Sequence, residues 1–212
     1  PYPLYAEGVA CAGETGLKES MEKMGTAESC QVGKMTQTGS SSETEMVIHD
    51  CLVVPHLQAT SYVEVISALA HRLVKCGYVT EGFLEAVLQR ETSMPTGLPL
   101  ADIPVAIPHA EAQYCIVPAI AVGILDQPVE FGEMGGYPGS TLPVQIVFLL
   151  AINDPNQQVK WLQRLVLLFQ TPALLKELKS LPNAKQIARF LQWNLLQKPP
   201  DAQPCFIDEG NG

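Results

Sequence analysis

The sequence predicts a single α/β domain built around a small mixed β-sheet, and three observations carry this prediction. Helical patterns occur before, between and after strand-like segments, an order typical of α/β domains. The strongly apolar stretches, residues 116–125 and 142–152, are too short to cross a bilayer and are rich in Val, Ile and Leu, as expected of buried strands. With 47% hydrophobic and 17% charged residues, the chain has the composition of a globular protein.

The two ends of the chain differ from its middle. Residues 1–45 contain no Phe, Ile or Trp and are rich in Gly, Ser, Thr, Glu and Lys, so they cannot bury enough apolar area to offset the entropy lost on ordering. We expect a poorly ordered leader over residues 1–45, or a working start at Met46. The domain is expected over residues 46–197, followed by a flexible, proline-rich tail over residues 198–212.

The first part of the domain is expected to hold one strand and two helices. Residues Val47–Val54 are predicted to form the strand. A helix is predicted over Ser61–Cys76, with Ser61 as its N-cap and Gly77 just beyond its end. A second helix is predicted over Thr80–Arg90. The side chains expected to face inward from these helices are Val63, Ile66, Ala70, Leu73, Phe83, Leu84, Val87 and Leu88.

The rest of the domain is expected to hold four strands followed by three helices. The strand-like segments are rich in Val and Ile and bounded by Pro or Gly, whereas the last third of the chain shows helical periodicity. The predicted strands are Val105–Ile107, Ile116–Leu125, Val129–Phe131 and Val144–Ala151, and the predicted helices are Asn156–Gln170, Pro172–Ser180 and Asn183–Leu196.

Charge and cysteine content narrow the function classes. A formal net charge of −9 offers no basic surface for binding nucleic acid and disfavours binding to an anionic membrane surface. We therefore expect small-molecule or protein partners and no membrane insertion. No secretory signal is visible, and the six cysteines show neither a CxxC pair nor zinc-ligand spacing. We therefore expect free thiols and a cytoplasmic location, although an even cysteine count leaves three disulfides open.

Of the four histidines, His109 is the candidate for chemistry. His71 falls on the polar face of its predicted helix, and His49 and His56 flank the first predicted strand, so ordinary surface or structural roles are favoured for all three. His109 directly follows the strand-like Ile103–Ile107 and the rigid Pro108. It thus lies where a buried strand ends, the position at which ligands and chemistry gather in α/β folds.

The segment upstream of His109 contains groups suited to binding an anion. Arg90 ends a predicted helix, and its guanidinium offers a planar fork that matches phosphate oxygens. The turn at Thr96-Gly97 can direct backbone N–H groups toward an anion. Without the nearby histidine, an exposed arginine at a helix end would be the simpler interpretation.

These residues also carry a family resemblance. The pattern Arg90-Glu91, then Pro95-Thr96-Gly97, then Ala106-Ile107-Pro108-His109 resembles the active-site signature of the fructose/mannitol-type (type-2) IIA domains of the bacterial phosphotransferase system (PTS). The resemblance covers roughly residues 47–196. Within the family it looks closest to the galactitol-type branch, through Pro108–Ala112 and Asp154–Gln158.

The resemblance implies a fold and a mechanism. The fold would be a central mixed sheet of about five strands with helices on both faces. The protein would be a phosphotransferase component without metal or cofactor, which accepts a phosphoryl group from the carrier protein HPr on His109 and passes it to a cysteine of a cognate IIB subunit. The membrane subunit IIC would be involved only indirectly. The substrate taken up would be galactitol or a similar sugar or polyol. Arg90 and the backbone of Thr96 and Gly97 would stabilise the phosphoryl oxygens.

One departure from the family pattern concerns Gln158. Mannitol-type and nitrogen-regulatory relatives usually place a second histidine there, so Gln158 becomes a possible second contact to the site, or an ordinary solvated residue. Two other classes of function stay open: a IIA-like regulatory domain that reports phosphorylation state, and a non-catalytic α/β domain that binds a small molecule.

Overall fold

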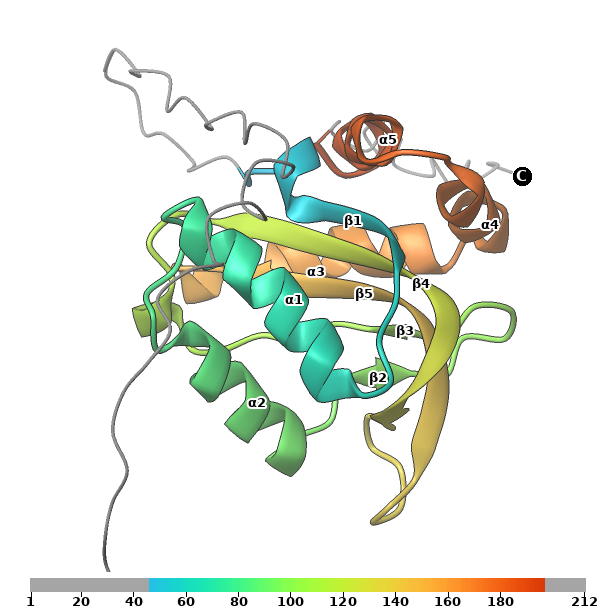
Figure 1. Ribbon diagram of the computed structural model, residues 1–212, viewed down its shortest axis with the longest axis horizontal. Helices are drawn as coiled ribbons and strands as arrows, with labels where there is room; N and C mark the ends of the chain where they lie inside the picture. The colour runs from blue at the N-terminus through green and yellow to red at the C-terminus, as the bar shows by residue number, and fades with distance from the viewer. Residues whose placement is uncertain (1–45, 197–212) are drawn as a thin grey trace, which may run out of the picture. The chain divides into compact units, whose positions relative to one another are not determined.

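The computed structural model describes residues 46–196, so the predicted leader and tail lie outside the described residues. In Figure 1 the helices of this range surround one sheet. The strands are β1 (Val53–Leu57), β2 (Gly97–Leu98), β3 (Val105–Ala106), β4 (Ala119–Gly132) and β5 (Thr141–Ala151), and the helices are α1 (Tyr62–Lys75), α2 (Phe83–Ser93), α3 (Pro155–Phe169), α4 (Pro172–Ser180) and α5 (Ala184–Leu196). Two short 3-10 turns cover Asp50–Leu52 and Ala112–Tyr114.

The sheet has five strands in the order β1-β4-β5-β3-β2 and is mixed. The pairs β1–β4 and β3–β5 are parallel, whereas β4–β5 and β2–β3 are antiparallel. The predicted fold class is therefore confirmed. Because β3 and β5 run in the same direction, their carboxyl ends lie at one edge of the sheet, and α3 begins just beyond that edge.

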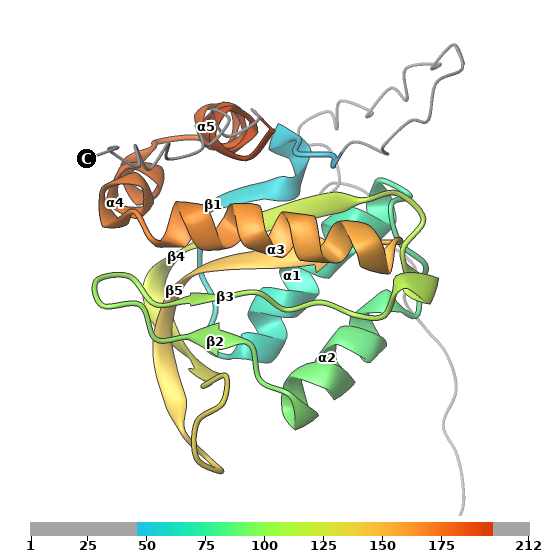
Figure 2. The same cartoon turned by 180° about the vertical axis from the view of Figure 1, so that it is seen from behind.

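Helices cover both faces of the sheet, which explains its nearly continuous apolar strands. Helices α1 and α2 lie on the face toward the viewer in Figure 1, and α3 crosses the opposite face in Figure 2, with α4 and α5 beside it. Alternate residues of β4 divide between two apolar cores. Ile120 and Val122 pack on the side of α3, α4 and α5, while Ala119 and Ala121 pack on the side of α1 and α2.

The helix signals in the sequence are confirmed for α1, α3, α4 and α5. Ser61 caps α1, since its hydroxyl oxygen accepts the N–H of Glu64 at 3.3 Å. Gly77 follows the helix with a φ of 72°, the left-handed conformation that favours glycine. The last three helices agree with prediction to within one residue at each end. The inward orientation predicted for Val63 is wrong, because this side chain is 40% exposed.

The first predicted strand and the second predicted helix are displaced along the chain. The segment 47–54 contains a 3-10 turn at Asp50–Leu52, and the strand proper is Val53–Leu57. Helix α2 begins at Phe83 rather than Thr80, because the N–H of Phe83 bonds to the Thr80 carbonyl in a separate turn. It continues to Ser93, which places Arg90 inside its last turn.

Two further differences concern strands, and both arise from long-range pairing. The predicted strands 116–125 and 129–131 are one strand, β4, because β5 pairs with it on both sides of an irregularity between Ile124 and Val129. The turn expected at Thr96-Gly97 is instead the start of a strand, because Gly97–Leu98 pairs with Val105–Ala106 as strand β2. Within the described residues, no helix is both long and apolar enough to span a bilayer.

Candidate functional site

His109 lies at the carboxyl end of β3, beside the end of β5. The N–H of Leu150 donates to the carbonyl of Pro108 at 2.9 Å, and His109 itself forms a parallel bridge with Leu150. The backbone of His109 is thus held by a central strand of the sheet while its side chain is partly exposed. This is the strand-end position predicted from the sequence.

A hydrogen bond to the backbone orients the His109 imidazole. Nδ1 lies 2.9 Å from the carbonyl oxygen of Ile107. A carbonyl oxygen can only accept, so Nδ1 must carry the proton that is donated. In the neutral ring Nε2 then has no proton and keeps its lone pair, which is the arrangement required of a nitrogen nucleophile.

The surroundings of His109 favour its neutral form. Burial lowers the pKa of His109 below its ordinary value, and the nearby Arg90 guanidinium lowers it further, against opposite effects of the Ile107 hydrogen bond and the Glu111 carboxylate. The imidazole is therefore neutral near pH 7 and available as a nucleophile. Cys115, the buried cysteine on the same side of the sheet as α1 and α2, is a poor competitor, because burial raises the pKa of its thiol to about 11.

Arg90 combines a positive charge with unused hydrogen-bonding capacity. Among residues 46–196, its buried Nε has no hydrogen-bond partner, and Nη1 makes only a weak interaction of 3.9 Å with Met94 Sδ. In the part of the chain that the structure describes, no carboxylate pairs with Arg90. An unsatisfied buried donor is unfavourable in a resting protein. Next to a histidine nucleophile, it is a ready site for an anionic oxygen.

Thr96 and Gly97 lie at the start of β2, which pairs antiparallel with β3, the strand that leads to His109. The Thr96 N–H donates to Glu91 Oε1 at 2.9 Å and its hydroxyl donates to Glu91 Oε2 at 2.8 Å. The Thr96 amide is thus already occupied. A Cβ added to Gly97 would lie 2.5 Å from the Gly132 carbonyl oxygen, so only glycine fits this approach of two strands.

Gln158 lies near the beginning of α3, four residues after Asp154, whose carbonyl accepts its backbone N–H at 3.1 Å. Its side chain is half-buried and makes no hydrogen bond to another residue of the described range 46–196, His109 included. The structure places Gln158 beyond the edge where β3 and β5 end. Within that range, no hydrogen bond to another residue occupies its side-chain amide.

The remaining histidines lie in surface positions, as their sequence context indicated. His49 Nδ1 is 2.8 Å from Asp50 Oδ1, and His56 Nδ1 is 2.9 Å from Asp126 Oδ1. His71 is exposed on α1. Among residues 46–196, none of these three histidines forms a hydrogen bond or ion pair with Arg90 or with His109.

Glu91 is the residue at this site to which the sequence analysis assigned no role. It is only 4% exposed and, with Thr96, is one of two buried polar residues within the described chain. The signal was present in the sequence. Glu91 continues the i, i+4 row of Phe83 and Val87, which is the buried stripe of α2, so a carboxylate there must point inward.

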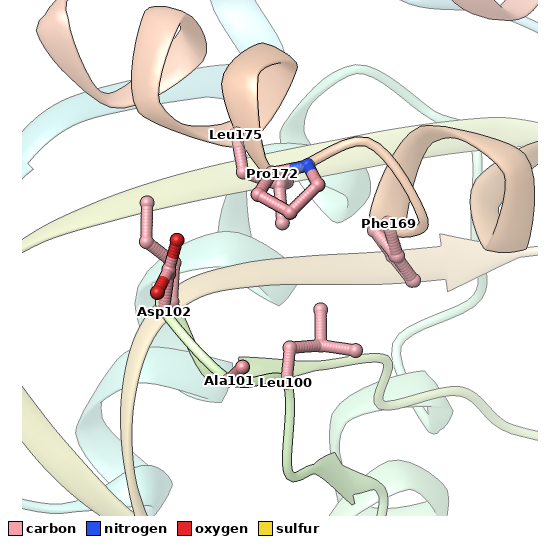
Figure 3. Close-up of a pocket in the computed structure, with 7 residues that line it drawn as sticks. Leu100, Ala101, Asp102, Phe169, Pro172 and Leu175 are labelled. Carbon is pink, nitrogen blue, oxygen red and sulfur yellow. The ribbon is translucent and has the colours of Figure 1, made fainter.

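A small pocket lies apart from His109, between the loop before β3 and the junction of α3 and α4 (Figure 3). Its volume is about 70 Å³, and its lining is mostly apolar, with the carboxylate of Asp102 at the rim paired to Lys176 Nζ at 2.7 Å. Ligand pockets usually have volumes of about 300–1,000 Å³. This pocket is too small for a sugar. Within residues 46–196, no three His, Cys, Asp or Glu side chains gather as a metal site would require.

Comparisons with known proteins agree on one family. Residues 46–193 match the family model "Phosphoenolpyruvate-dependent sugar phosphotransferase system, EIIA 2". The chain is 28% identical over 132 residues to the galactitol-specific EIIA component of the PTS of Escherichia coli K12, covering 62% of this chain and 87% of that protein. It is 27% identical over 144 residues to the transcriptional regulator ManR of Bacillus subtilis, covering 67% of this chain but only 20% of the regulator.

Solved structures show the same fold. The chain resembles one chain from the solved complex of enzyme IIAMTL with phosphorylated enzyme IIBMTL of Escherichia coli. The TM-score is 0.58 and the identity is 20%, over 70% of this chain and 99% of the matched chain. At this identity the likeness concerns the fold alone.

Proposed function

Because the chain belongs to the EIIA 2 family of phosphoryl-transfer components of the sugar PTS, we propose that His109 is its phosphoacceptor and that Nε2 is the nitrogen phosphorylated. The observation that carries this proposal is the hydrogen bond of 2.9 Å between His109 Nδ1 and the Ile107 carbonyl. It leaves the Nε2 lone pair available in a neutral ring. The same bond holds the ring plane while the phosphoryl group arrives and leaves.

The transfer needs no proton movement at His109. The Nε2 lone pair forms a bond to phosphorus, and the bond between phosphorus and the donor's imidazole nitrogen breaks, which returns the electron pair to the donor. Nδ1–H remains bonded to Ile107 throughout and stabilises the positive charge that the ring gains. Catalysis of phosphoryl transfer consists mainly of such positioning, together with stabilisation of charge on the equatorial oxygens.

We assign the stabilisation of the phosphoryl oxygens to Arg90. Its Nε is buried without a partner, and its guanidinium is near enough to His109 to lower the histidine pKa. A phosphoryl oxygen would satisfy that donor through a charge-assisted hydrogen bond. Since the Thr96 amide is bonded to Glu91, we assign Thr96 and Gly97 to holding the strand beside His109 rather than to direct phosphoryl contact. Gln158 remains a candidate second contact.

The proposed donor is phosphorylated HPr, and the proposed acceptor is a cysteine of a cognate IIB subunit. Membership of the family supports both, and the solved complex of enzyme IIAMTL with phosphorylated enzyme IIBMTL is an assembly of this kind. In the second step a thiolate forms a bond to phosphorus while the bond from Nε2 to phosphorus breaks. We place this relay in the cytoplasm, with membrane IIC involved only through IIB.

The proposed substrate system is that for galactitol or a related polyol. Support comes from the 28% identity to galactitol-specific EIIA components and from the amide, rather than imidazole, side chain at Gln158. A regulatory role is the second candidate, because a segment of the ManR regulator is similar to this chain over 144 residues. The third alternative, a non-catalytic domain that binds a small molecule, is disfavoured because the chain belongs to a family of phosphoryl-transfer components.

The test is labelling from phosphoenolpyruvate in the presence of enzyme I and HPr. The wild-type chain should take up one phosphoryl group, and NMR of the labelled protein should locate it on His109 Nε2. His109→Ala should remain folded and take up none, with His71→Ala as a control that labels normally. Adding galactitol-type IIB should discharge the label, whereas a purely regulatory domain would retain it. Labelling of folded His109→Ala would refute the assignment.

A further inference from the structure

A buried carboxylate lies next to the proposed site and takes no part in the transfer step itself. Glu91 lies in the last turn of α2 and is 4% exposed, and burial raises the pKa of its carboxyl group. Burying an ionisable group is unfavourable unless its partners compensate. Both Glu91 oxygens are used by one residue, Thr96, through its N–H at 2.9 Å and its hydroxyl at 2.8 Å. We call this pair of residues, Glu91 and Thr96, the clamp.

The clamp is connected to the His109 imidazole by two further hydrogen bonds. The Thr96 carbonyl accepts the N–H of Ile107 at 3.3 Å, and the Ile107 carbonyl accepts the His109 Nδ1–H at 2.9 Å. The carbonyl that sets the tautomer of His109 therefore belongs to the peptide that follows β3. On one side this peptide is held by β5, which pairs with β3 and bonds to Pro108, and on the other side its position depends on how β2 is held against β3.

The β2–β3 ladder alone gives this position little support. Only two residue pairs connect the strands, Gly97 with Ala106 and Leu98 with Val105, and a loop separates them in the chain. A ladder of two pairs can shift or fray, since short strand pairs are marginal by themselves. The clamp ties the first residue before β2 to helix α2, and the same helix turn carries Arg90. The clamp thereby links the strand beside His109 to the helix turn that carries Arg90.

We propose that Glu91 is a positioning residue for phosphoryl transfer, which acts through Thr96 and Ile107 to hold the Ile107 carbonyl where it fixes the Nδ1–H tautomer of His109. This inference rests on the proposed function, because it takes His109 as the phosphoacceptor. Without the clamp, the neutral ring can place its proton on Nε2. That tautomer has no lone pair at Nε2 and cannot attack phosphorus.

The experiment compares Glu91→Ala, Glu91→Gln and Thr96→Val with the conservative Thr96→Ser. Serine keeps both donors to Glu91, valine keeps only the N–H, and glutamine keeps one acceptor oxygen. Two measurements are made on each folded variant: the His109 tautomer, from ring-nitrogen chemical shifts of the unphosphorylated protein, and the rate of transfer from phosphorylated HPr. Ile187→Val, a mild core change on α5 at a fully buried position, controls for loss of stability alone.

We expect Glu91→Ala to populate the Nε2–H tautomer and to lower the transfer rate by about ten- to a hundredfold, as misplacement of a reacting group does. Glu91→Gln and Thr96→Val should show smaller changes in both measurements, Thr96→Ser should recover wild-type values, and Ile187→Val should alter neither. If Glu91→Ala does not fold, Glu91→Gln and Thr96→Val decide the matter.

An unchanged tautomer in these variants would overturn the proposal, whether or not the rate falls, because Glu91 would then act in some other way. Failure of the proposed function has a different signature. Wild-type protein would take up no label at His109, while the tautomer measurement, which needs no phosphoryl donor, would still report on the clamp.

Discussion

Replacing Arg90 by lysine should slow phosphoryl transfer without destabilising the domain. Lysine retains the positive charge and most of the aliphatic stem but removes the guanidinium fork and its Nε. That Nε is buried and has no hydrogen-bond partner within the described part of the chain, so the substitution breaks no strong hydrogen bond there. The substitution also removes the weak interaction of 3.9 Å between Nη1 and Met94 Sδ, which contributes little to stability.

The expected changes in unfolding free energy and in transfer rate both follow from the unpaired state of the Arg90 Nε–H donor. A buried unsatisfied donor costs about 1–3 kcal/mol, so the free energy of unfolding of Arg90→Lys should be unchanged or higher by up to about 1 kcal/mol. A hydrogen bond from a charged group is worth about 1.5–3 kcal/mol, which corresponds to a loss of about 10- to 150-fold in transfer rate if the bond forms only in the transition state.

Urea unfolding measures the first quantity, and rapid-quench transfer from phosphorylated HPr measures the second. Arg164→Lys is the matched control, because Arg164 Nη1 donates to the Leu195 carbonyl at 2.9 Å and its guanidinium lies 4.6 Å from the Trp161 ring centroid. That variant should lose about 1 kcal/mol of stability and keep its transfer rate. The reasoning is refuted if Arg90→Lys behaves like Arg164→Lys, with lower stability and normal transfer.

Three other predictions concern pH, Gln158 and the leader. Since the pKa of His109 in the folded protein lies below its ordinary value of about 6.5, the transfer rate should be constant near neutral pH and fall only below that value. The stability contributed by the neutral ring is present above the pKa of the unfolded state and is lost as the pH falls through the pKa of the folded state. Urea titrations below about pH 6.5 should show this loss in the wild type and not in His109→Ala. If Gln158 contacts the phosphoryl group, Gln158→Leu should slow transfer by a factor equivalent to about 1–3 kcal/mol. Gln158→His should retain transfer, and its rate should show an additional titration near the imidazole pKa. An unchanged rate in Gln158→Leu would show that Gln158 is an ordinary solvated residue. A chain beginning at Met46 should match the full chain in melting temperature and phosphoryl uptake, and a melting point lower by several degrees would show that residues 1–45 stabilise the domain.

Local sequence signals predict the type and order of most elements and select the candidate nucleophile. Caps and apolar periodicity are local signals, which is why α1, α3, α4 and α5 agree closely with prediction. His109 could be selected from four histidines because Pro108 and the apolar strand before it are adjacent in the chain. The motif from Arg90 to His109 further indicated which segments belong together.

How those segments meet depends on contacts that form only in the folded chain. Pairing with β5 joins two predicted strands into β4 across an irregularity, and pairing with β3 turns Gly97–Leu98 into a strand. The tautomer of His109 depends on the Ile107 carbonyl, and the Glu91–Thr96 clamp depends on α2 lying against the start of β2. A hydrogen bond of this kind is set by distance and direction between groups that the folded backbone brings together, and residue type and spacing along the chain do not specify either one.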